Sequence, residues 1–194
     1  LVDITNYSTI ALNRPLHVFD ADKIKGDIHI RMAEEGEKML ALDGKEYTLD
    51  KEMTVIADDK NAEALAGVMG GATTGVSEQT VNVMLEAAYF NPVRTAMTGR
   101  KLNLMSDARY RFERGVDPAF LEDGTAIASQ LILDLCGGKA SEIIKVGSEP
   151  NWRRKYFLRS SRVENLGGVK VTPNRTREIL EILGFEVTEI EGGW

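Results

Sequence analysis

The stretch from Ala64 to Glu86, ALAGVMGGATTGVSEQTVNVMLE, constrains the fold of this chain more than any other. Its two apolar segments are interrupted by four glycines, Gly67, Gly70, Gly71 and Gly75. Glycine lacks Cβ, so the backbone can take positive φ and a ligand can approach its N–H groups closely. The second apolar segment carries one carboxylate, Glu86, which must find a partner or change its pKa where it is buried. The stretch predicts either a small pocket, with donors facing an acceptor, or a tight turn between strands.

Other catalytic patterns are scarce. The glycines match neither G-x-G-x-x-G nor G-x-x-x-x-G-K-[ST], which disfavours a phosphate loop. Two histidines and one cysteine without spaced ligand pairs do not make a zinc site, and no G-x-S-x-G elbow offers a serine nucleophile. His29 alternates outward on an expected strand and is predicted at the surface. His17, between apolar neighbours, is the best candidate for a base near neutral pH, with a hydrogen-bonded core histidine as the alternative.

Composition points to a soluble globular protein. The chain has 194 residues, of which 43% are hydrophobic and 28% charged. No apolar run approaches the roughly 18 residues of a membrane span, and no signal segment opens the chain, so we expect a cytoplasmic protein. The single Cys136 excludes an internal disulfide and is expected to be a small core residue. The start at Leu1, without Met, suggests a piece of a longer protein.

Charge is distributed unevenly along the chain. A net charge of −6 argues against a general nucleic-acid binder. Residues 91–116 nevertheless hold six basic and two acidic side chains, and Arg153-Arg154-Lys155 forms a second basic cluster. Each cluster is either a solvated face or a contact for one end of a nucleic acid.

The first ninety residues are predicted to be mostly strand. Residues 1–12 are the end of a helix or a strand. The expected strands are Leu16–Phe19, Asp27–Met32, a hairpin over Met39–Leu49, Thr54–Ala57, Glu63–Met69 and Val81–Phe90. The hairpin is assigned a type I′ turn because Asp43-Gly44 supplies residues that tolerate positive φ.

Helices follow the strands. Asn91-Pro92 predicts a helix to about Leu102, and Asp117-Pro118 predicts another that stops at Gly137-Gly138. Residues 143–146 are predicted as a strand. Beyond a boundary near residue 149, residues 160–166 and 173–183 are expected helices, the second capped at Thr172-Pro173, and residues 185–190 are an expected strand. The fold class is therefore α+β: a strand-rich, layered, β/β/α sandwich-like domain over residues 1–148, then a linker and part of a small α/β domain over residues 149–194.

Residues 106–117, SDARYRFERGVD, alternate charged and aromatic side chains and are predicted to be extended or irregular. Tyr110 and Phe112 would then share one face, opposite the charged residues. Two interpretations stay open: a strand with a salt-bridged outer face, or a pocket wall formed by the small side chains of Ser106 and Ala108.

Six stretches of the chain carry a recognisable pattern. They are Asp3-Ile-Thr-Asn-Tyr7, Arg14-Pro-Leu-His-Val-Phe-Asp20, Leu42-Asp-Gly44, Ala66-Gly-Val-Met-Gly-Gly71, Leu85-Glu-Ala-Ala-Tyr-Phe90 and Ser106–Pro118, within which Phe112-Glu-Arg-Gly-Val-Asp-Pro118 is highly specific. Through these stretches, which cover about residues 1–148, the chain resembles a known family, the β subunit of bacterial phenylalanyl-tRNA synthetase, in its B3/B4 editing domain. The stretches keep the family's order. Residues from about 153 onward resemble the start of the following B5 domain.

The resemblance implies that the whole enzyme, an α2β2 heterotetramer, charges tRNA-Phe using ATP and magnesium. It also implies that this part hydrolyses tRNA wrongly charged with tyrosine. The family's editing positions fall on five residues here, His17 and Ser106 as candidates for catalysis and Gly70, Glu86 and Ala108 for substrate binding. Many members have Thr at position 106. The family's upstream editing arginine and its magnesium-binding acids lie outside the chain, so no metal and no cofactor are expected in this part.

The implied chemistry is selective hydrolysis. Glu86 would accept a hydrogen bond from the tyrosine hydroxyl, and water would attack the aminoacyl ester with help from His17 or from the tRNA's own terminal hydroxyl. The alternatives are a non-catalytic module that docks tRNA or supports the heterotetramer, and an unrelated carbohydrate enzyme. The last would need a second carboxylate about 5–10 Å from Glu86.

Overall fold

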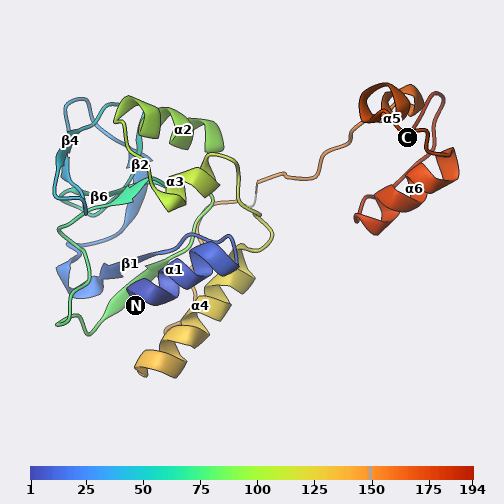
Figure 1. Cartoon of the computed structure of the whole chain (residues 1–194). Helices are drawn as coiled ribbons and strands as arrows, with labels where there is room; N and C mark the ends of the chain where they lie inside the picture. Colours follow the sequence, from blue (N-terminus) through green and yellow to red (C-terminus); the bar gives the residue numbers. More distant parts are fainter. Residues whose placement is uncertain (149) are drawn as a thin grey trace. The chain divides into compact units, whose positions relative to one another are not determined.

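The computed structural model describes residues 1–148 and 150–194 and divides the chain into two compact units, Leu1–Pro150 and Asn151–Trp194 (Figure 1). Unit 1 contains the helices α1 (Val2–Ala11), η1 (Ala21–Lys23), α2 (Pro92–Lys101), α3 (Asp107–Phe112) and α4 (Leu121–Cys136). Its strands are β1 (His17–Asp20), β2 (His29–Met32), β3 (Lys38–Leu40), β4 (Glu46–Thr48), β5 (Thr54–Ala57), β6 (Ala62–Leu65), β7 (Met69–Gly70) and β8 (Val83–Glu86). Unit 2 contains α5 (Ser160–Gly167) and α6 (Pro173–Ile182).

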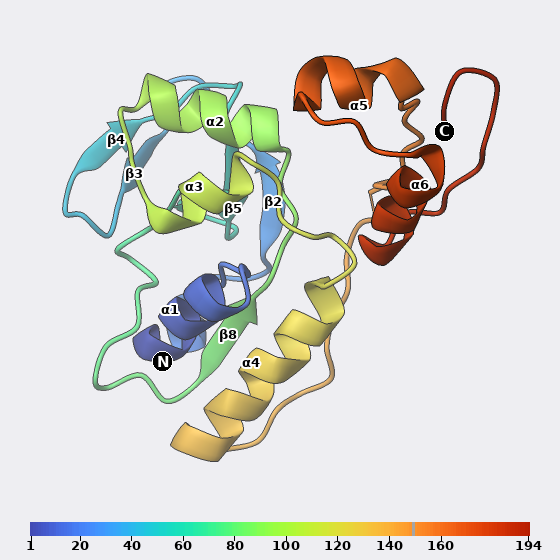
Figure 2. The ribbon, with the colours of Figure 1, turned by 45° about the vertical axis from the view of Figure 1, so that its right-hand side comes forward.

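The strands of unit 1 form three antiparallel groups. A four-stranded sheet has the order β2-β5-β6-β7, and the pairs β1-β8 and β3-β4 stand beside it. Helices α1 and α4 pack against each other near β1 and β8 (Figure 2). The predicted α+β class, with several antiparallel sheets accompanied by helices, is confirmed.

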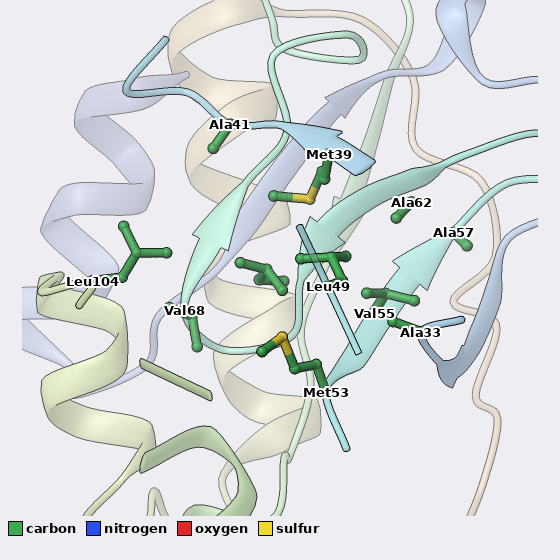
Figure 3. Packing of buried hydrophobic residues seen from close by; sticks show 11 residues of the cluster. Ala33, Met39, Ala41, Leu49, Met53, Val55, Ala57, Ala62, Val68 and Leu104 are labelled. Carbon is green, nitrogen blue, oxygen red and sulfur yellow. The ribbon is translucent and has the colours of Figure 1, made fainter. Parts of the chain in front are cut away.

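Core residues cover both faces of the four-stranded sheet, because successive side chains of β5 point to opposite faces. Val55 and Ala57 face one hydrophobic cluster, and Ile56 between them faces the other. The first cluster, shown in Figure 3, also contains Met39 from β3 and Leu49 from the loop after β4. The second cluster joins the sheet to β1 and α3 through Phe19 and Phe112 and their neighbours. The strand pair β1-β8 is therefore fixed to the main sheet by buried apolar contacts.

A buried acid that the sequence did not single out lies at a bulge. Ile56 pairs with Ala64 but Ala57 pairs with Ala62, which leaves Glu63 as the extra residue of β6. The Glu63 side chain is buried and accepts hydrogen bonds from the hydroxyls of Thr73 and Thr74. This carboxylate joins the segment after the glycine turn, which comprises residues 67–71, to the sheet.

Two helix predictions near the centre of the chain have different outcomes. The cap at Asn91 is confirmed, because its side chain accepts from Arg94 N–H at the start of α2. Residues 107–112, predicted to be extended or irregular, instead form α3. Ser106 caps this helix, accepting from Arg109 N–H at 3.0 Å, and an N-cap with an acid in the first turn outweighs the alternating pattern.

Turn and boundary predictions also need correction. The hairpin does not have a type I′ turn, because only Gly44 in the loop has positive φ and type I′ needs two such residues. Gly44 N–H instead donates to Ala41 C=O, within a three-residue loop. Helix α4 begins at Leu121 rather than at Pro118, since Asp117 accepts from Ala119 N–H in a turn of its own. Cys136, predicted to be a core residue, is exposed at the end of α4.

Two predicted strands are absent from the described residues. Residues 143–146 pair with no strand, and Ile144 and Val146 are exposed. Residues 185–190 make only an isolated bridge between Ile190 and Gly193. An apolar alternation becomes a strand only when a neighbouring strand accepts its backbone hydrogen bonds. In unit 2 the predicted cap at Thr172 is confirmed at the start of α6.

Candidate functional site

The candidate site is built on the strand pair β1-β8. His17 and Glu86 are directly opposite each other in this antiparallel pair. Each has one side-chain atom, His17 Nε2 and Glu86 Oε1, that is buried without a hydrogen-bond partner. Buried polar atoms are nearly always hydrogen-bonded in folded proteins, and exceptions need an explanation such as a catalytic or binding role.

Gly70, in the glycine turn, lies against the His17 side chain of this pair. A Cβ at Gly70 would lie 2.3 Å from His17 Cε1, so only glycine lets the imidazole lie against the β7 backbone. The ring also packs edge-on against Phe19, with centroids 4.3 Å apart. Gly70 C=O accepts from Leu42 N–H at 3.0 Å, which joins the turn to the β3-β4 hairpin.

Burial changes the charge of both side chains in the pair. It lowers the pKa of His17 to about 4, so the imidazole is neutral at neutral pH. Burial also raises the pKa of Glu86 to about 8, although the positive charge of Arg14 opposes this shift. Glu86 as a whole is only partly covered, but solvent does not reach its Oε1, and this burial is the cause of the raised pKa.

Arg14 is the residue that the sequence reasoning missed as a functional candidate. Its side chain is fully buried, and its guanidinium donates to the carbonyls of Ala88, at 3.4 Å, and Asp117. Burial lowers the pKa of Arg14, while Asp117 and Glu86 raise it. A buried arginine beside a buried carboxyl is uncommon, and its position three residues before His17 was the available signal.

Ser106 and Ala108 reach the region from α3. Ser106 Oγ donates to Val68 C=O at 2.6 Å as well as capping the helix, so it joins α3 to the glycine turn. Ala108 is half-buried and packs against the second hydrophobic cluster. Both residues therefore have structural roles, and the pocket-wall assignment stays a prediction.

Unit 1 contains at least two cavities among its described residues. One of about 170 Å³ lies between the sheet and the start of α2 and is lined by Thr54, Tyr89 and Arg94 among others. The second, of about 250 Å³, borders Arg14 and Phe120. None of the five predicted site residues lines either cavity. In the described part of the chain, no group of three His, Cys, Asp or Glu side chains is placed to hold a metal ion.

Neighbouring acids pair with part of the basic stretch before Val116. Lys101 pairs with Asp50 at 2.6 Å, and Arg109 and Arg114 both pair with Glu113. Pairing reduces the positive potential available to a phosphate backbone. Among the described residues, no helix combines the length and apolar character of a membrane span.

These features define an α+β domain in which the glycine turn lies against a half-buried histidine and glutamate pair, and comparison with known proteins identifies its family. The family model described as the B3/4 domain matches residues 1–137. The chain therefore belongs to the B3/4 domain family.

The chain is also similar to named relatives over nearly all of its length. It is 56% identical over 193 residues to the phenylalanine–tRNA ligase beta subunit of Paramagnetospirillum magneticum, covering 100% of the chain and 24% of that protein. It is 52% identical over 187 residues to the same subunit of Ruegeria pomeroyi, covering 96% of the chain and 23% of that protein. The resemblance found in the sequence is confirmed, and the chain spans about a quarter of the length of these relatives.

A solved structure is also similar, though distantly. It is an N-terminal fragment of the phenylalanyl-tRNA synthetase beta subunit from Pyrococcus horikoshii, with 18% identity and a TM-score of 0.42. The match covers 96% of this chain and 55% of the other.

Proposed function

We propose that this chain is the editing part of a phenylalanine–tRNA ligase β subunit and hydrolyses tRNA-Phe wrongly charged with tyrosine. The proposal extends the similarity to proteins of that name, of which the chain spans about a quarter. In the whole enzyme, an α subunit, ATP and magnesium would serve the charging reaction, and this part would need no metal or cofactor. The cytoplasm, where tRNA is charged in bacteria, would be its compartment.

The observation that carries the proposal is the pair His17 and Glu86. Both present a buried polar atom without a hydrogen-bond partner, from opposite positions of one strand pair. A ligand with a hydroxyl group would satisfy Glu86 Oε1, and folding alone does not explain why this atom is left unpaired.

Selection of tyrosine follows from this arrangement. Phenylalanine and tyrosine differ by one hydroxyl, and a site that hydrogen-bonds a hydroxyl can discriminate by about 10⁴–10⁵. The tyrosine hydroxyl would donate to Glu86, whose carboxyl keeps an acceptor oxygen in either protonation state. Phenylalanine would leave that buried oxygen unpaired, so correctly charged tRNA would be spared.

The neutral state of His17 defines its role in hydrolysis. The pKa of His17 is about 4, so the imidazole has little tendency to accept a proton at neutral pH and is a weak general base. Its imidazole can still accept a hydrogen bond from the attacking water and orient it towards the ester. The tRNA's own terminal hydroxyl would then assist proton transfer.

The non-catalytic alternative predicts a Glu86 that is salt-bridged on a closed strand face. Among the described residues Glu86 forms no ion pair, and Oε1 has no partner, which favours the editing role. Membership of the B3/4 family likewise gives no support to the carbohydrate alternative.

The test is deacylation by the whole synthetase that contains this chain. Tyrosyl-tRNA-Phe and phenylalanyl-tRNA-Phe are incubated separately with the enzyme, and loss of the amino acid is followed with time. The proposal predicts much faster hydrolysis of the tyrosyl ester. Equal rates for the two esters, or no hydrolysis above the rate without enzyme, would contradict it.

A further inference from the structure

Arg14 is buried where three segments of unit 1 meet. It precedes β1, and its guanidinium donates to Ala88, two residues after Glu86, and to Asp117, between α3 and α4. Arg14 Cζ lies 5.9 Å from the centroid of the Phe120 ring. One side chain thus joins the end of the β1-β8 pair that carries His17 and Glu86 to the segment before α4, the last helix of the unit.

The packing around Arg14 leaves it little freedom. Its side chain is wholly covered, and a Cβ at Gly124 on α4 would lie 3.1 Å from Arg14 Cγ. The glycine therefore leaves the space that the arginine stem occupies. Its Nε, like Glu86 Oε1 and His17 Nε2, is buried without a hydrogen-bond partner. Three of the four such atoms in the described structure belong to this one cluster.

We infer that Arg14 is a positioning residue for Glu86: its buried guanidinium fixes the end of β8 and places a positive charge beside the carboxyl that selects tyrosine. The inference rests on the proposed function. A buried charge next to a buried acid is costly to remove, because either partner alone would remain unpaired in a medium of low polarity. Arg14 touches no reacting atom and acts only through Glu86.

The charges around Glu86 define the expected effect on pH dependence. His17 faces Glu86 across the strand pair and is neutral at neutral pH, and Arg14 has Asp117 on its other side. At the opposite end of the strand pair, Asp20 forms an ion pair with Lys23 of η1. The positive charge of Arg14 favours ionised Glu86, so removing it raises the pKa of that carboxyl further.

The experiment uses the whole synthetase and measures hydrolysis of tyrosyl-tRNA-Phe and phenylalanyl-tRNA-Phe between pH 6 and 9. The ratio of the two rates cancels the general effect of hydroxide on ester hydrolysis. We expect the wild-type ratio to change around the pKa of Glu86. In Arg14→Gln, which is neutral but keeps a hydrogen-bond donor, the midpoint of this change moves up by about one pH unit or more. Arg14→Lys retains the charge, and its midpoint stays closer to that of the wild type.

Two further variants complete the test. Asp117→Asn keeps an acceptor for Ala119 N–H but removes the negative charge beside Arg14, and should move the midpoint down. Asp117→Asn retains Arg14, so this variant tests the role of the charge near Glu86 even if Arg14→Gln does not fold. Arg100→Gln, at an exposed arginine of α2, is the matched control and should leave the midpoint unchanged.

The results separate this inference from the proposed function. A selective wild type whose ratio and midpoint are unchanged in Arg14→Gln and Asp117→Asn would overturn the role of Arg14 alone. A wild type that does not prefer the tyrosyl ester would overturn the proposed function itself.

Discussion

His17 lies directly opposite Glu86 in the β1-β8 pair, and each residue has one buried polar side-chain atom without a hydrogen-bond partner in the described structure. The main sheet does not include this pair, which is held to it by Phe19 and by the hydrogen bond from Asp20 N–H to Thr74 C=O at 2.8 Å. The two side chains are therefore placed by one strand pair, and their geometry depends on the glycine turn behind them.

The first prediction concerns that turn. Gly70→Ala would bring a methyl group to 2.3 Å from His17 Cε1, so the imidazole must move. We expect hydrolysis of tyrosyl-tRNA to fall, with a loss of about 1–3 kcal/mol in the free energy of unfolding, as for overpacking of a core. Deacylation and urea denaturation measure the two effects. Gly167→Ala, where an added Cβ meets nothing within 4 Å, is the control and should leave hydrolysis unchanged.

Ser106 gives a second prediction, on stability. Ser106→Ala removes the cap of α3 and the bond to Val68 C=O, and should cost about 0.5–2 kcal/mol of unfolding free energy. Ser106→Thr keeps the hydroxyl and should retain most of it. Asn91→Ala removes the cap of α2 and should cost a similar amount without affecting deacylation. Equal deacylation in Ser106→Ala and Asn91→Ala would show that Ser106 has no role in editing.

The pKa values of the pair predict how stability changes with pH. The pKa of Glu86 rises from 4.5 to about 8 on folding, so its contribution is complete below pH 4.5 and is lost as pH rises to about 8. The pKa of His17 falls from 6.5 to about 4, so its contribution is complete above pH 6.5 and is lost as pH falls. Between pH 4.5 and 6.5, where the two ranges overlap, the two effects on the free energy of unfolding oppose each other.

Above pH 6.5 the contribution of Glu86 alone should therefore appear. We expect the free energy of unfolding of this chain to decrease between pH 6.5 and 8.5, and Glu86→Gln to lack most of that decrease. Urea denaturation at both pH values measures it. If the variant loses as much stability as the wild type, Glu86 is not protonated in the folded state.

Sequence patterns predicted these features unevenly. The strand at Thr54–Ala57 and the caps at Asn91 and Thr172 depend on local residues, and they were found from the sequence. The helix at residues 107–112 was missed, because charge alternation suggested a strand and the cap at Ser106 was not recognised.

The surroundings of the candidate site were harder to predict. The apolar strand around Glu86 was visible in the sequence, but its pairing with His17 joins residues far apart in the chain. Arg14 was missed because its partners, Ala88 and Asp117, are separated from it by 74 and 103 residues. Local patterns do not show contacts of this range, and the one local indication was the position of Arg14 three residues before His17.

Charge leads to a prediction about tRNA binding. The net charge is −6, and the basic residues of α2 and α3 are mostly paired with acids. We expect this 194-residue chain alone to bind tRNA-Phe weakly, with an affinity that falls as salt is raised. Filter binding at salt concentrations between 50 and 200 mM measures this affinity. Over that range, proteins that contact many phosphates lose about 10³-fold or more in affinity. Tight binding that salt does not weaken would contradict this expectation.

The most direct test of the account is the selectivity of Glu86→Ala in the whole synthetase. Deacylation of tyrosyl-tRNA-Phe and phenylalanyl-tRNA-Phe is measured for wild type and variant, with melting temperatures to confirm folding. Removing the acceptor would leave the buried tyrosine hydroxyl without a partner, which costs about 1–3 kcal/mol, so the tyrosine-to-phenylalanine ratio should fall by about 5- to 150-fold. Loss of both activities by the same factor would instead assign Glu86 to the chemical step. An unchanged ratio would contradict its role in recognising tyrosine.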